Sequence, residues 1–469
     1  MDNGAMSHNA LWSLAEVAPH LNAGLMGDPE VVPNALSLDT RTLKPGNCFV
    51  ALRAERDGHE FAAQALAKGA TALVVDHELE LAIPQLLVED TTQALQRWGQ
   101  ARLAAHRPPA VFGVTGSVGK TSTKELLAGA TGAWKTPGNR NNTLGMPEAL
   151  AMLPTDTPAV VLEMGMSFPG EIRRLTEIAP LDFAIITNVG TAHIENFVQG
   201  PQGIAQAKGE IVAGTRPGGT WVHLASDDWA RWISLQAWAQ HTRAVAVGEG
   251  GAWGWAEPRS LGPLGERFRL LTPSGPLDIL LKLRGAHQVR NAALAGAMAL
   301  LAGFDPEQVA EGLGRVQPDE GRGRLHELPE GGWLMDESYN ASQASILACG
   351  ASLMELPGGE AVAVLGCMRE LGTESERLHR ETGEGLASLG LRRLWVYGDQ
   401  AAAMASGFGF GAEAYPDFEA MRDDSRGLGA IPTGARILVK GSRHWRSERA
   451  VSWLLARRSA SINETTILG

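Results

Sequence analysis

Cysteine and long apolar runs are scarce in this sequence. Only three of its 469 residues are cysteine, and they lie far apart as Cys48, Cys349 and Cys367. Such scattered thiols exclude a disulfide framework and a structural zinc site, and they favour a reducing compartment. No run reaches the roughly 18 consecutive apolar residues that a membrane span requires, and the first residues lack the basic start and apolar core of a secretory signal. We therefore expect a cytoplasmic protein without a membrane span.

The sequence is also short of basic side chains. Lys and Arg together number 41 against 52 for Asp and Glu, so the formal net charge is −11. This excess of negative charge argues against a protein that coats nucleic acid, and we expect no nucleic-acid partner. Hydrophobic residues make up 44% of the chain and charged residues 20%, an ordinary globular balance that excludes a disordered or fibrous chain.

The length and the order of the apolar segments predict a multidomain α/β protein. At about 100–200 residues per domain, 469 residues suggest about three domains. Apolar runs of strand length alternate with longer helical patterns, which is typical of α/β architecture with parallel sheets. We place the domains at residues 1–88, 89–325 and 326–469, and we expect a monomer.

Ten apolar runs predict strands, three in each of the first two domains and four in the last. They are residues 47–52, 71–75, 86–88, 110–115, 159–162, 183–187, 332–335, 361–365, 394–397 and 436–439. Helical patterns span residues 91–106, 286–301 and 375–389. Residues 260–276 are rich in Gly and Pro, which favours loops or an edge hairpin.

The most informative segment is residues 115–123, with the sequence Thr-Gly-Ser-Val-Gly-Lys-Thr-Ser-Thr. It follows a predicted strand and opens a helical pattern. Glycines let a backbone wrap closely around phosphate, and a helix N-terminus supplies free N–H groups. Lys120 would neutralise the phosphates, and the Thr121 hydroxyl would ligate Mg²⁺. Because position 114 is Val, this is the short Gly-x-x-Gly-Lys-Thr form of a phosphate-binding loop, made of Gly116, Ser117, Val118, Gly119, Lys120, Thr121 and Ser122.

Two further strand ends carry possible metal ligands. Glu163 follows the strand at 159–162, and a carboxylate at a strand's carboxyl end beside a phosphate loop is well placed to ligate Mg²⁺. His193 follows the strand at 183–187. Glu163 could equally be a loop acid, and a lone histidine is more often structural than a ligand. The edge that both share with the phosphate loop favours a functional role.

Four other residues are candidates on weaker grounds. Lys208 lies in a pattern rich in Ala and Ile, where a lysine is usually solvated. If desolvated, its amine could be neutral and could react with carbon dioxide to form a carbamate, which would turn a cation into a metal-binding carboxylate. His287 and Asn291 lie four apart on one helix face and could meet a purine ring or face solvent. Asp336 ends a strand, where it could bind a ribose hydroxyl or serve a turn.

Together these residues resemble the ATP-dependent muramoyl-peptide ligases. The resemblance runs from about residue 37 to residue 443, nearly the whole chain, in the family's order. Its other motifs are residues 37–46, 57–61, 138–147, 207–211, 339–340, 370–372, 375–379 and 440–443. The joint match is specific, although no single piece is.

The resemblance implies three domains: an N-terminal α/β domain for a UDP-linked substrate, a central parallel-sheet ATPase domain that contains the phosphate loop, and a C-terminal Rossmann-like domain. It implies that ATP drives the formation of an amide bond through an acyl phosphate, in the synthesis of a peptidoglycan precursor. The implied substrates are UDP-N-acetylmuramoyl-tripeptide and D-alanyl-D-alanine. The third residue of the tripeptide, lysine or diaminopimelate, stays open.

The resemblance also assigns roles to residues of this chain. The implied catalytic residues are Lys120, His193 and Lys208. The implied ligands of Mg²⁺, of which we expect two ions, are Thr121, Glu163, His193 and a carbamylated Lys208. The residues implied around ATP, besides the phosphate loop, are Asn142, His287, Asn291, Arg322 and Asp336. Those implied for the UDP-substrate are Ser37, Asp39, Thr40 and Arg41.

The chain departs from the family's usual residues around the nucleotide and dipeptide contacts of the last domain. The departures are Gln288, Glu337, Ser342, Gln343 and Cys367. Three alternatives therefore stay open: a phosphate-loop phosphotransferase or regulatory NTPase without ligation, a non-catalytic nucleotide-binding scaffold, and a sibling ligase that adds a single amino acid or acts on folates.

Overall fold

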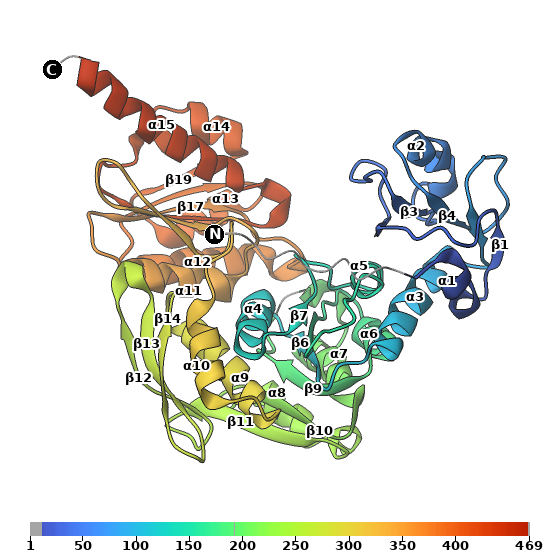
Figure 1. Ribbon diagram of the computed structural model, residues 1–469. Coiled ribbons are helices and arrows are strands. Elements are labelled where there is room, and N and C mark those ends of the chain that lie inside the picture. Colours follow the sequence, from blue (N-terminus) through green and yellow to red (C-terminus); the bar gives the residue numbers. More distant parts are fainter. Residues whose placement is uncertain (1–11, 192, 468–469) are drawn as a thin grey trace.

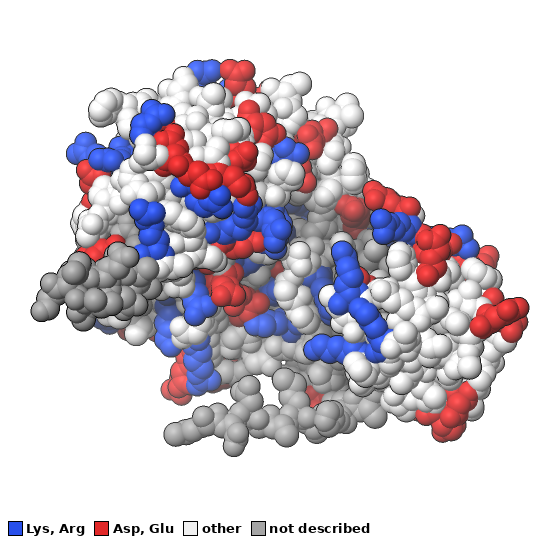
Figure 2. Space-filling view, turned by 90° about the horizontal axis from the view of Figure 1, so that it is seen from above, with Lys and Arg blue, Asp and Glu red and all other residues white. Residues whose placement is uncertain are grey.

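The computed structural model describes residues 12–191 and 193–467, which form three sheets with their helices (Figure 1). Each sheet is mainly parallel, as the alternation of apolar runs predicted. Among the described residues, no helix is long and apolar enough to cross a membrane. The face seen in Figure 2 carries basic and acidic side chains next to one another rather than one continuous basic surface.

The N-terminal sheet has five strands in the order β1-β5-β4-β3-β2, and only β1 runs antiparallel to its neighbour. The strands are β1 (Gly24–Met26), β2 (Ala35–Ser37), β3 (Asn47–Val50), β4 (Ala72–Val75) and β5 (Gln85–Leu87). Every residue of β3 and β4 is buried, because helices cover both faces of a parallel sheet. Those helices are α1 (Leu14–Leu21) and α3 (Thr91–Ala105) on one face and α2 (Ala62–Ala67) on the other.

The central sheet has nine strands in the order β14-β13-β12-β11-β10-β9-β6-β8-β7. They are β6 (Val111–Thr115), β7 (Trp134–Lys135), β8 (Val160–Glu163), β9 (Leu181–Ile186), β10 (Thr215–Leu224), β11 (Arg243–Glu249), β12 (Gly254–Ser260), β13 (Glu266–Leu271) and β14 (Leu277–Leu281). The strands from β7 to β12 are parallel, and β12, β13 and β14 form an antiparallel edge. Residues 260–276, for which we expected loops or an edge hairpin, contain β13, which forms hairpins with β12 before it and β14 after it.

Helices cover both faces of the central sheet. One core lies beneath α4 (Lys120–Thr131), α9 (Ala286–Leu301) and α10 (Pro306–Arg315). The other lies beneath α5 (Gly145–Leu150), α6 (Glu171–Ile178), α7 (Pro201–Ala213) and α8 (Asp228–Ser234). Figure 1 shows α4 and α9 near the middle of the molecule, between the sheet and the C-terminal unit. The helix predicted at 286–301 is confirmed at both ends.

The C-terminal sheet has six strands in the order β15-β16-β20-β17-β18-β19, parallel except for β15. They are β15 (Arg324–Glu327), β16 (Trp333–Glu337), β17 (Ala361–Gly366), β18 (Arg393–Tyr397), β19 (Ala412–Tyr415) and β20 (Arg436–Lys440). Its helices are α11 (Gln343–Met354), α12 (Ser375–Ser388), α13 (Ala401–Phe408), α14 (Phe418–Asp423) and α15 (Glu448–Ile467). The boundary that we placed after residue 325 falls inside β15, and the exact domain limits stay a prediction.

Candidate active site

The phosphate loop lies where the sequence placed it, between the end of β6 and the start of α4. Gly119 caps α4 with φ 83° and offers no side chain, so the first N–H groups of the helix are left for a ligand. A Cβ on Gly116 would lie 1.8 Å from Oγ1 of Thr187, and one on Gly119 would lie 2.7 Å from Oδ1 of Asn291. Close packing therefore requires glycine at both positions.

The segment after β9 braces the phosphate loop. Oδ1 of Asn188 accepts hydrogen bonds from the N–H groups of Ser117 and Val118, both at 3.1 Å. Oγ1 of Thr187 donates to the carbonyl of Val118 at 2.5 Å, and Oγ of Ser117 accepts from the N–H of Gly190 at 2.8 Å. The N–H groups of Ser117 and Val118 are thus already engaged, which leaves the N-terminus of α4 as the main backbone donor to an anion.

A cation and an acid meet at the start of α4. Nζ of Lys120 donates to the carbonyl of Gly116 at 2.8 Å. Burial lowers the pKa of Lys120, although the carboxylate of Glu163 opposes that shift. Oγ1 of Thr121 donates to Oε2 of Glu163 at 2.8 Å, and Nδ2 of Asn141 donates to Oε1 at 2.9 Å. Glu163, at the end of β8, is only 2% exposed, so these donors satisfy a buried carboxylate.

A second lysine supports the same acid. Lys124 lies one turn after Lys120 on α4 and is completely buried. Its Nζ donates to the carbonyls of Thr136 at 3.0 Å and Gly138 at 2.8 Å, and it lies 3.5 Å from Oε2 of Glu163. This lysine therefore connects the phosphate-loop helix, the segment around residues 136–138 and Glu163, the predicted metal ligand.

The oxygen atoms at this edge fit Mg²⁺. The Thr121 hydroxyl and the Glu163 carboxylate lie side by side, and both are ligand types that this ion prefers. Within the described residues, Glu163 and His193 belong to no set of three ligating side chains. Such a set does occur at His59, Asp76 and His77 of the N-terminal sheet, with donor atoms within 4.8 Å of one another. However, Nε2 of His59 already accepts the N–H of Asp76 at 3.1 Å, so this group is a structural network.

His193 and Lys208 lie on the central domain close to the phosphate loop. Burial lowers the pKa of His193, and the charges of Lys120 and Lys208 add to that effect. Its Nδ1 lies 2.5 Å from Oε2 of Glu370 in the C-terminal domain. Lys208, on α7, is 2% exposed, which excludes the solvated surface position. Burial and the nearby Lys120 hold the pKa of Lys208 well below its usual value, so its amine loses its proton more readily.

Asn142, predicted to lie by the phosphates, is exposed and faces α5. Its Oδ1 accepts hydrogen bonds from the N–H groups of Leu144 at 3.2 Å and Gly145 at 2.8 Å. The neighbouring Asn141 is the residue that reaches Glu163. The structure thus assigns the contact with the acid to the other asparagine of the pair, and a phosphate contact of Asn142 stays a prediction.

A small pocket lies between the start of α9 and the C-terminal sheet. Its lining residues are Leu283, Arg284, His287, Gln288, Arg322, Gly323, Met335, Glu337 and Ser352. It brings together His287 and Arg322, two of the residues predicted around the nucleotide. Asn291 donates to Oε1 of Gln288 at 3.1 Å, and Gln288 reaches Oγ of Ser122 at 3.5 Å, which links the pocket to the phosphate loop. Burial lowers the pKa of His287 to about 4, so its ring is neutral.

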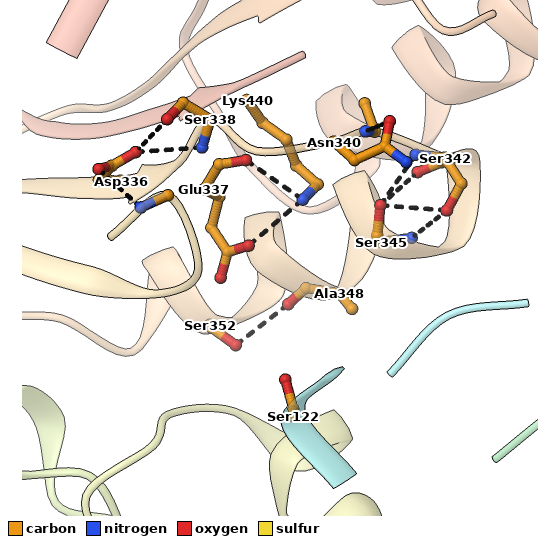
Figure 3. A network of polar contacts seen from close by, with 12 residues as sticks. Ser122, Asp336, Glu337, Ser338, Asn340, Ser342, Ser345, Ala348, Ser352 and Lys440 are labelled. Carbon is orange, nitrogen blue, oxygen red and sulfur yellow. Dashed lines mark hydrogen bonds and ion pairs between the residues drawn. The ribbon is translucent and has the colours of Figure 1, made fainter. Parts of the chain in front are cut away.

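Asp336 and Glu337 point to different partners (Figure 3). Oδ2 of Asp336 accepts from the N–H of Gly321 at 3.0 Å, and Oδ1 accepts from the hydroxyl of Ser338 at 2.6 Å. Glu337 instead lines the pocket and lies 3.3 Å from Nζ of Lys440. Within the structure Asp336 therefore serves a turn, and the acid that faces the pocket is its neighbour. A nucleotide contact of Asp336 stays a prediction.

The four residues predicted for the UDP-substrate lie at the end of β2, where Ser37 is its last residue, and in the turn that follows. Oγ of Ser37 donates to the carbonyl of Asp39 at 3.0 Å, and the guanidinium of Arg41 pairs with the Asp39 carboxylate at 2.6 Å. This pair lowers the pKa of Asp39. Thr40 is buried and donates to Oε1 of Gln64 at 2.7 Å, so it holds the turn onto α2. The structure brings the four residues together but places them on the N-terminal sheet, apart from the phosphate loop.

Sequence reasoning missed several residues of the site. They are Lys124, Asn141, Glu337 and Glu370. Three of them have a sequence signal that could have been used, since Lys124 lies one helical turn after Lys120 and the others adjoin residues that were chosen. Glu370 lies in a motif that was noticed but carries no local sign of its partner, because the contact joins two domains.

Comparisons with known proteins agree with this architecture. Two family models match: "Mur ligase middle domain" over residues 114–299 and "Mur ligase, glutamate ligase domain" over residues 322–443. The chain is 34% identical over 458 residues to the UDP-N-acetylmuramoyl-tripeptide–D-alanyl-D-alanine ligase of Escherichia coli. That alignment covers 94% of this chain and 97% of the relative.

Solved structures show the same fold. A crystal structure of MurF from Acinetobacter baumannii matches with a TM-score of 0.86 and 31% identity, over 96% of this chain and all of that one. The MurF ligase from Thermotoga maritima, in complex with ADP, matches with a TM-score of 0.78 and 27% identity, over 91% of this chain and 98% of that one. The three-sheet arrangement is thus a known one.

Proposed function

Because the chain belongs to the Mur ligase family, we propose that it uses ATP to join D-alanyl-D-alanine to UDP-N-acetylmuramoyl-tripeptide. The product is UDP-N-acetylmuramoyl-pentapeptide, a peptidoglycan precursor, and the enzyme is an ADP-forming ligase. The observation that carries this proposal is the alignment of almost the whole chain with UDP-N-acetylmuramoyl-tripeptide–D-alanyl-D-alanine ligases. The phosphate loop, whose Thr121 contacts the buried acid Glu163, supports it. Its three cysteines are free and buried, in keeping with a cytoplasmic location.

The chemistry explains why cations gather at the start of α4. A carboxylate condenses with an amine only after it gains a good leaving group. A carboxylate oxygen of the tripeptide therefore attacks the γ-phosphorus of ATP, ADP leaves, and an acyl phosphate forms. The amine of D-alanyl-D-alanine then attacks the acyl carbon, inorganic phosphate leaves, and the amide bond remains. The first step brings two anions together, so positive charge and positioning dominate catalysis.

The residues of this chain divide that work. Lys120 moves from the carbonyl of Gly116 to the phosphates, where its charge stabilises the transferring phosphoryl group. Thr121 and Glu163 hold Mg²⁺, which when bound neutralises charge on the phosphate oxygens. His287 and Arg322 hold the nucleotide from the pocket beside α9. The turn of Ser37 and Asp39 contacts the UDP part on the N-terminal sheet.

We further propose that Lys208 carries a carbamate. Its burial and lowered pKa favour a neutral amine, and a neutral amine attacks carbon dioxide to give a carbamate and a proton. The carbamate is an anion close to Lys120 and His193, and it replaces a lysine cation whose burial is unfavourable. It would supply a further oxygen ligand for a second Mg²⁺, with His193 beside it.

A phosphate-release assay tests the proposal against its alternatives. Phosphate is measured with ATP and UDP-N-acetylmuramoyl-tripeptide, with and without D-alanyl-D-alanine, and the product is weighed by mass spectrometry. We expect sustained release only when all three substrates are present, with a product heavier by one dipeptide residue unit. Release that needs neither the acid nor the amine would identify a phosphotransferase or NTPase, absence of turnover would identify a scaffold, and acceptance of a single amino acid or a folate would identify a sibling ligase.

A further inference from the structure

One polar contact joins the central and C-terminal domains directly beside the phosphate loop. Nδ1 of His193, in the segment after β9, lies 2.5 Å from Oε2 of Glu370, which follows β17. The two segments also pack against each other, since a Cβ on Gly372 would lie 3.1 Å from Cβ of Glu195. The contact therefore belongs to a docked surface and is not a chance approach of two long side chains.

The backbone of both partners is unusual. His193 has φ 61° and Glu370 has φ 63°. The described part of the chain holds only five non-glycine residues with such left-handed backbone, and two of them face each other here. Side chains adopt this conformation rarely, and it persists where surrounding structure enforces it, often at functional sites. The fold thus holds the imidazole and the carboxylate in place from both sides.

Glu370 supplies a negative charge near His193 that opposes the cations of the central domain. On the central domain the cations of Lys120 and Lys208 lower the pKa of the His193 imidazole, and the charge of Glu370 acts against them. That acid comes from another domain, so it is present only when the C-terminal domain is docked. Half of the Glu370 side chain is exposed, and an ion pair at such a position contributes little to stability.

We propose that Glu370 is a positioning residue that orients His193 for the metal site when the C-terminal domain docks. The negative carboxylate, 2.5 Å from Nδ1, favours the proton on that nitrogen, and this is the tautomer in which Nε2 carries the free electron pair that a metal ligand needs. Docking of the C-terminal domain thereby completes the site on the central domain. This inference rests on the proposed function, because it takes His193 as a ligand of Mg²⁺.

The test compares five full-length variants with the unmodified chain. Glu370→Met keeps the length of the side chain and removes the acceptor, whereas Glu370→Gln keeps an acceptor oxygen and removes the charge. Glu374→Met is the matched control, because this acid lies in the same segment but pairs with Arg377 of its own domain. The last two variants are His193→Gln alone and His193→Gln combined with Glu370→Met, which together show whether Glu370 acts through the histidine.

Two readouts are measured for each variant: Mn²⁺ affinity in the presence of ADP, by electron paramagnetic resonance, and the Mg²⁺ dependence of phosphate release. We expect Glu370→Met to weaken Mn²⁺ binding about tenfold or more, Glu370→Gln to weaken it less, and Glu374→Met to leave it unchanged. The melting temperatures of the variants should equal that of the unmodified chain. Glu370→Met should not weaken Mn²⁺ binding further in a chain that already carries His193→Gln.

Two results would overturn the inference. One is equal Mn²⁺ affinity and equal Mg²⁺ dependence in Glu370→Met and the unmodified chain. The other is a loss of affinity that Glu374→Met shares or that follows a fall in melting temperature, since either would indicate a general structural role. Failure of the proposed function is distinguishable, because the unmodified chain would then release no phosphate from the complete substrate mixture while Mn²⁺ binding could still be compared.

Discussion

Replacing Lys124 by methionine tests how the candidate active site is built. Lys124 is completely buried, donates to the carbonyls of Thr136 and Gly138, and lies 3.5 Å from Glu163. Methionine keeps the length and apolar stem of the side chain but removes its charge and its donors. The variant leaves the Glu163 carboxylate buried with one cation fewer, and it leaves the carbonyls of Thr136 and Gly138, the first of them buried, without this donor.

The size of the effect follows from what Lys124 touches. Removing one partner of a buried ion pair costs about 3–5 kcal/mol, because the remaining charge stays buried without compensation. Thr121 and Asn141 still donate to Glu163, so we expect the lower end, about 3 kcal/mol. In a domain of this size each kcal/mol lowers the melting temperature by about 2–4 °C, so the transition of the central domain should fall by roughly 6–12 °C.

Circular dichroism and urea unfolding measure the change, and a double-mutant cycle assigns it. Lys124→Met combined with Glu163→Gln should be less unstable than the sum of the single variants, by about 1–3 kcal/mol, because the unpaired charge is gone. Lys135→Met is the matched control, since Lys135 pairs with Glu125 of the same helix but is 41% exposed and should change stability by less than about 1 kcal/mol. A Lys124→Met protein as stable as the unmodified chain, or strict additivity in the cycle, would refute the reasoning.

Three further predictions concern activity and pH. Lys120→Ala should lower the turnover number for phosphate release about a hundredfold or more, because it removes one group that stabilises the transition state. Lys208→Ala should lose activity and regain part of it with added short carboxylates, and normal turnover without them would dismiss the carbamate. His287 has a folded pKa of about 4 against about 6.5 unfolded, so stability in urea should fall as the pH drops from about 6.5 to about 4, and His287→Gln should flatten that slope.

Much of the sheet structure was predictable because buried parallel strands appear in the sequence as short apolar runs. Each of the ten predicted strands has an observed counterpart whose ends differ by two residues or fewer, as β17 and β20 illustrate. Other strands were not predicted, and β10 is one of them. Its first half contains Arg216-Pro-Gly-Gly219, which is exposed or half-buried, and its pairing with β9 is irregular between Thr215 and Thr220. Local composition there argues against a strand, and only packing between β9 and β11 overrides it.

The phosphate loop was predictable for a different reason. Its strand, glycines and helix are contiguous in the chain, so one short segment holds the whole structural unit. The support of Glu163 was not predictable in the same way, because it combines two segments: Thr121 and Lys124 reach it from α4, and Asn141 reaches it from the loop before α5. Nor could the pair of His193 and Glu370 be foreseen, since a contact between two domains leaves no periodic pattern in either of them.

Asp336 and Glu337 show how strand geometry divides two neighbouring acids. Successive side chains of a strand point to opposite faces of the sheet, and on β16 Leu334 and Met335 accordingly enter different cores. Met335 and Glu337 share the face that lines the pocket. Asp336, on the other face, accepts the N–H of Gly321 through its carboxylate, while its backbone carbonyl accepts the N–H of Gly323.

The residue between those two glycines links the buried acid to the pocket. Arg322 lies in the segment that Asp336 holds, lines the pocket, and stacks its guanidinium 3.8 Å above the ring of Tyr339. Asp336 therefore shapes the turn that presents a cation to the pocket. Glu337 lines the pocket from the sheet itself and pairs with Lys440 (Figure 3). A sequence shows that two adjacent strand acids must face opposite sides of the sheet, but only the packed sheet decides which of them faces the pocket.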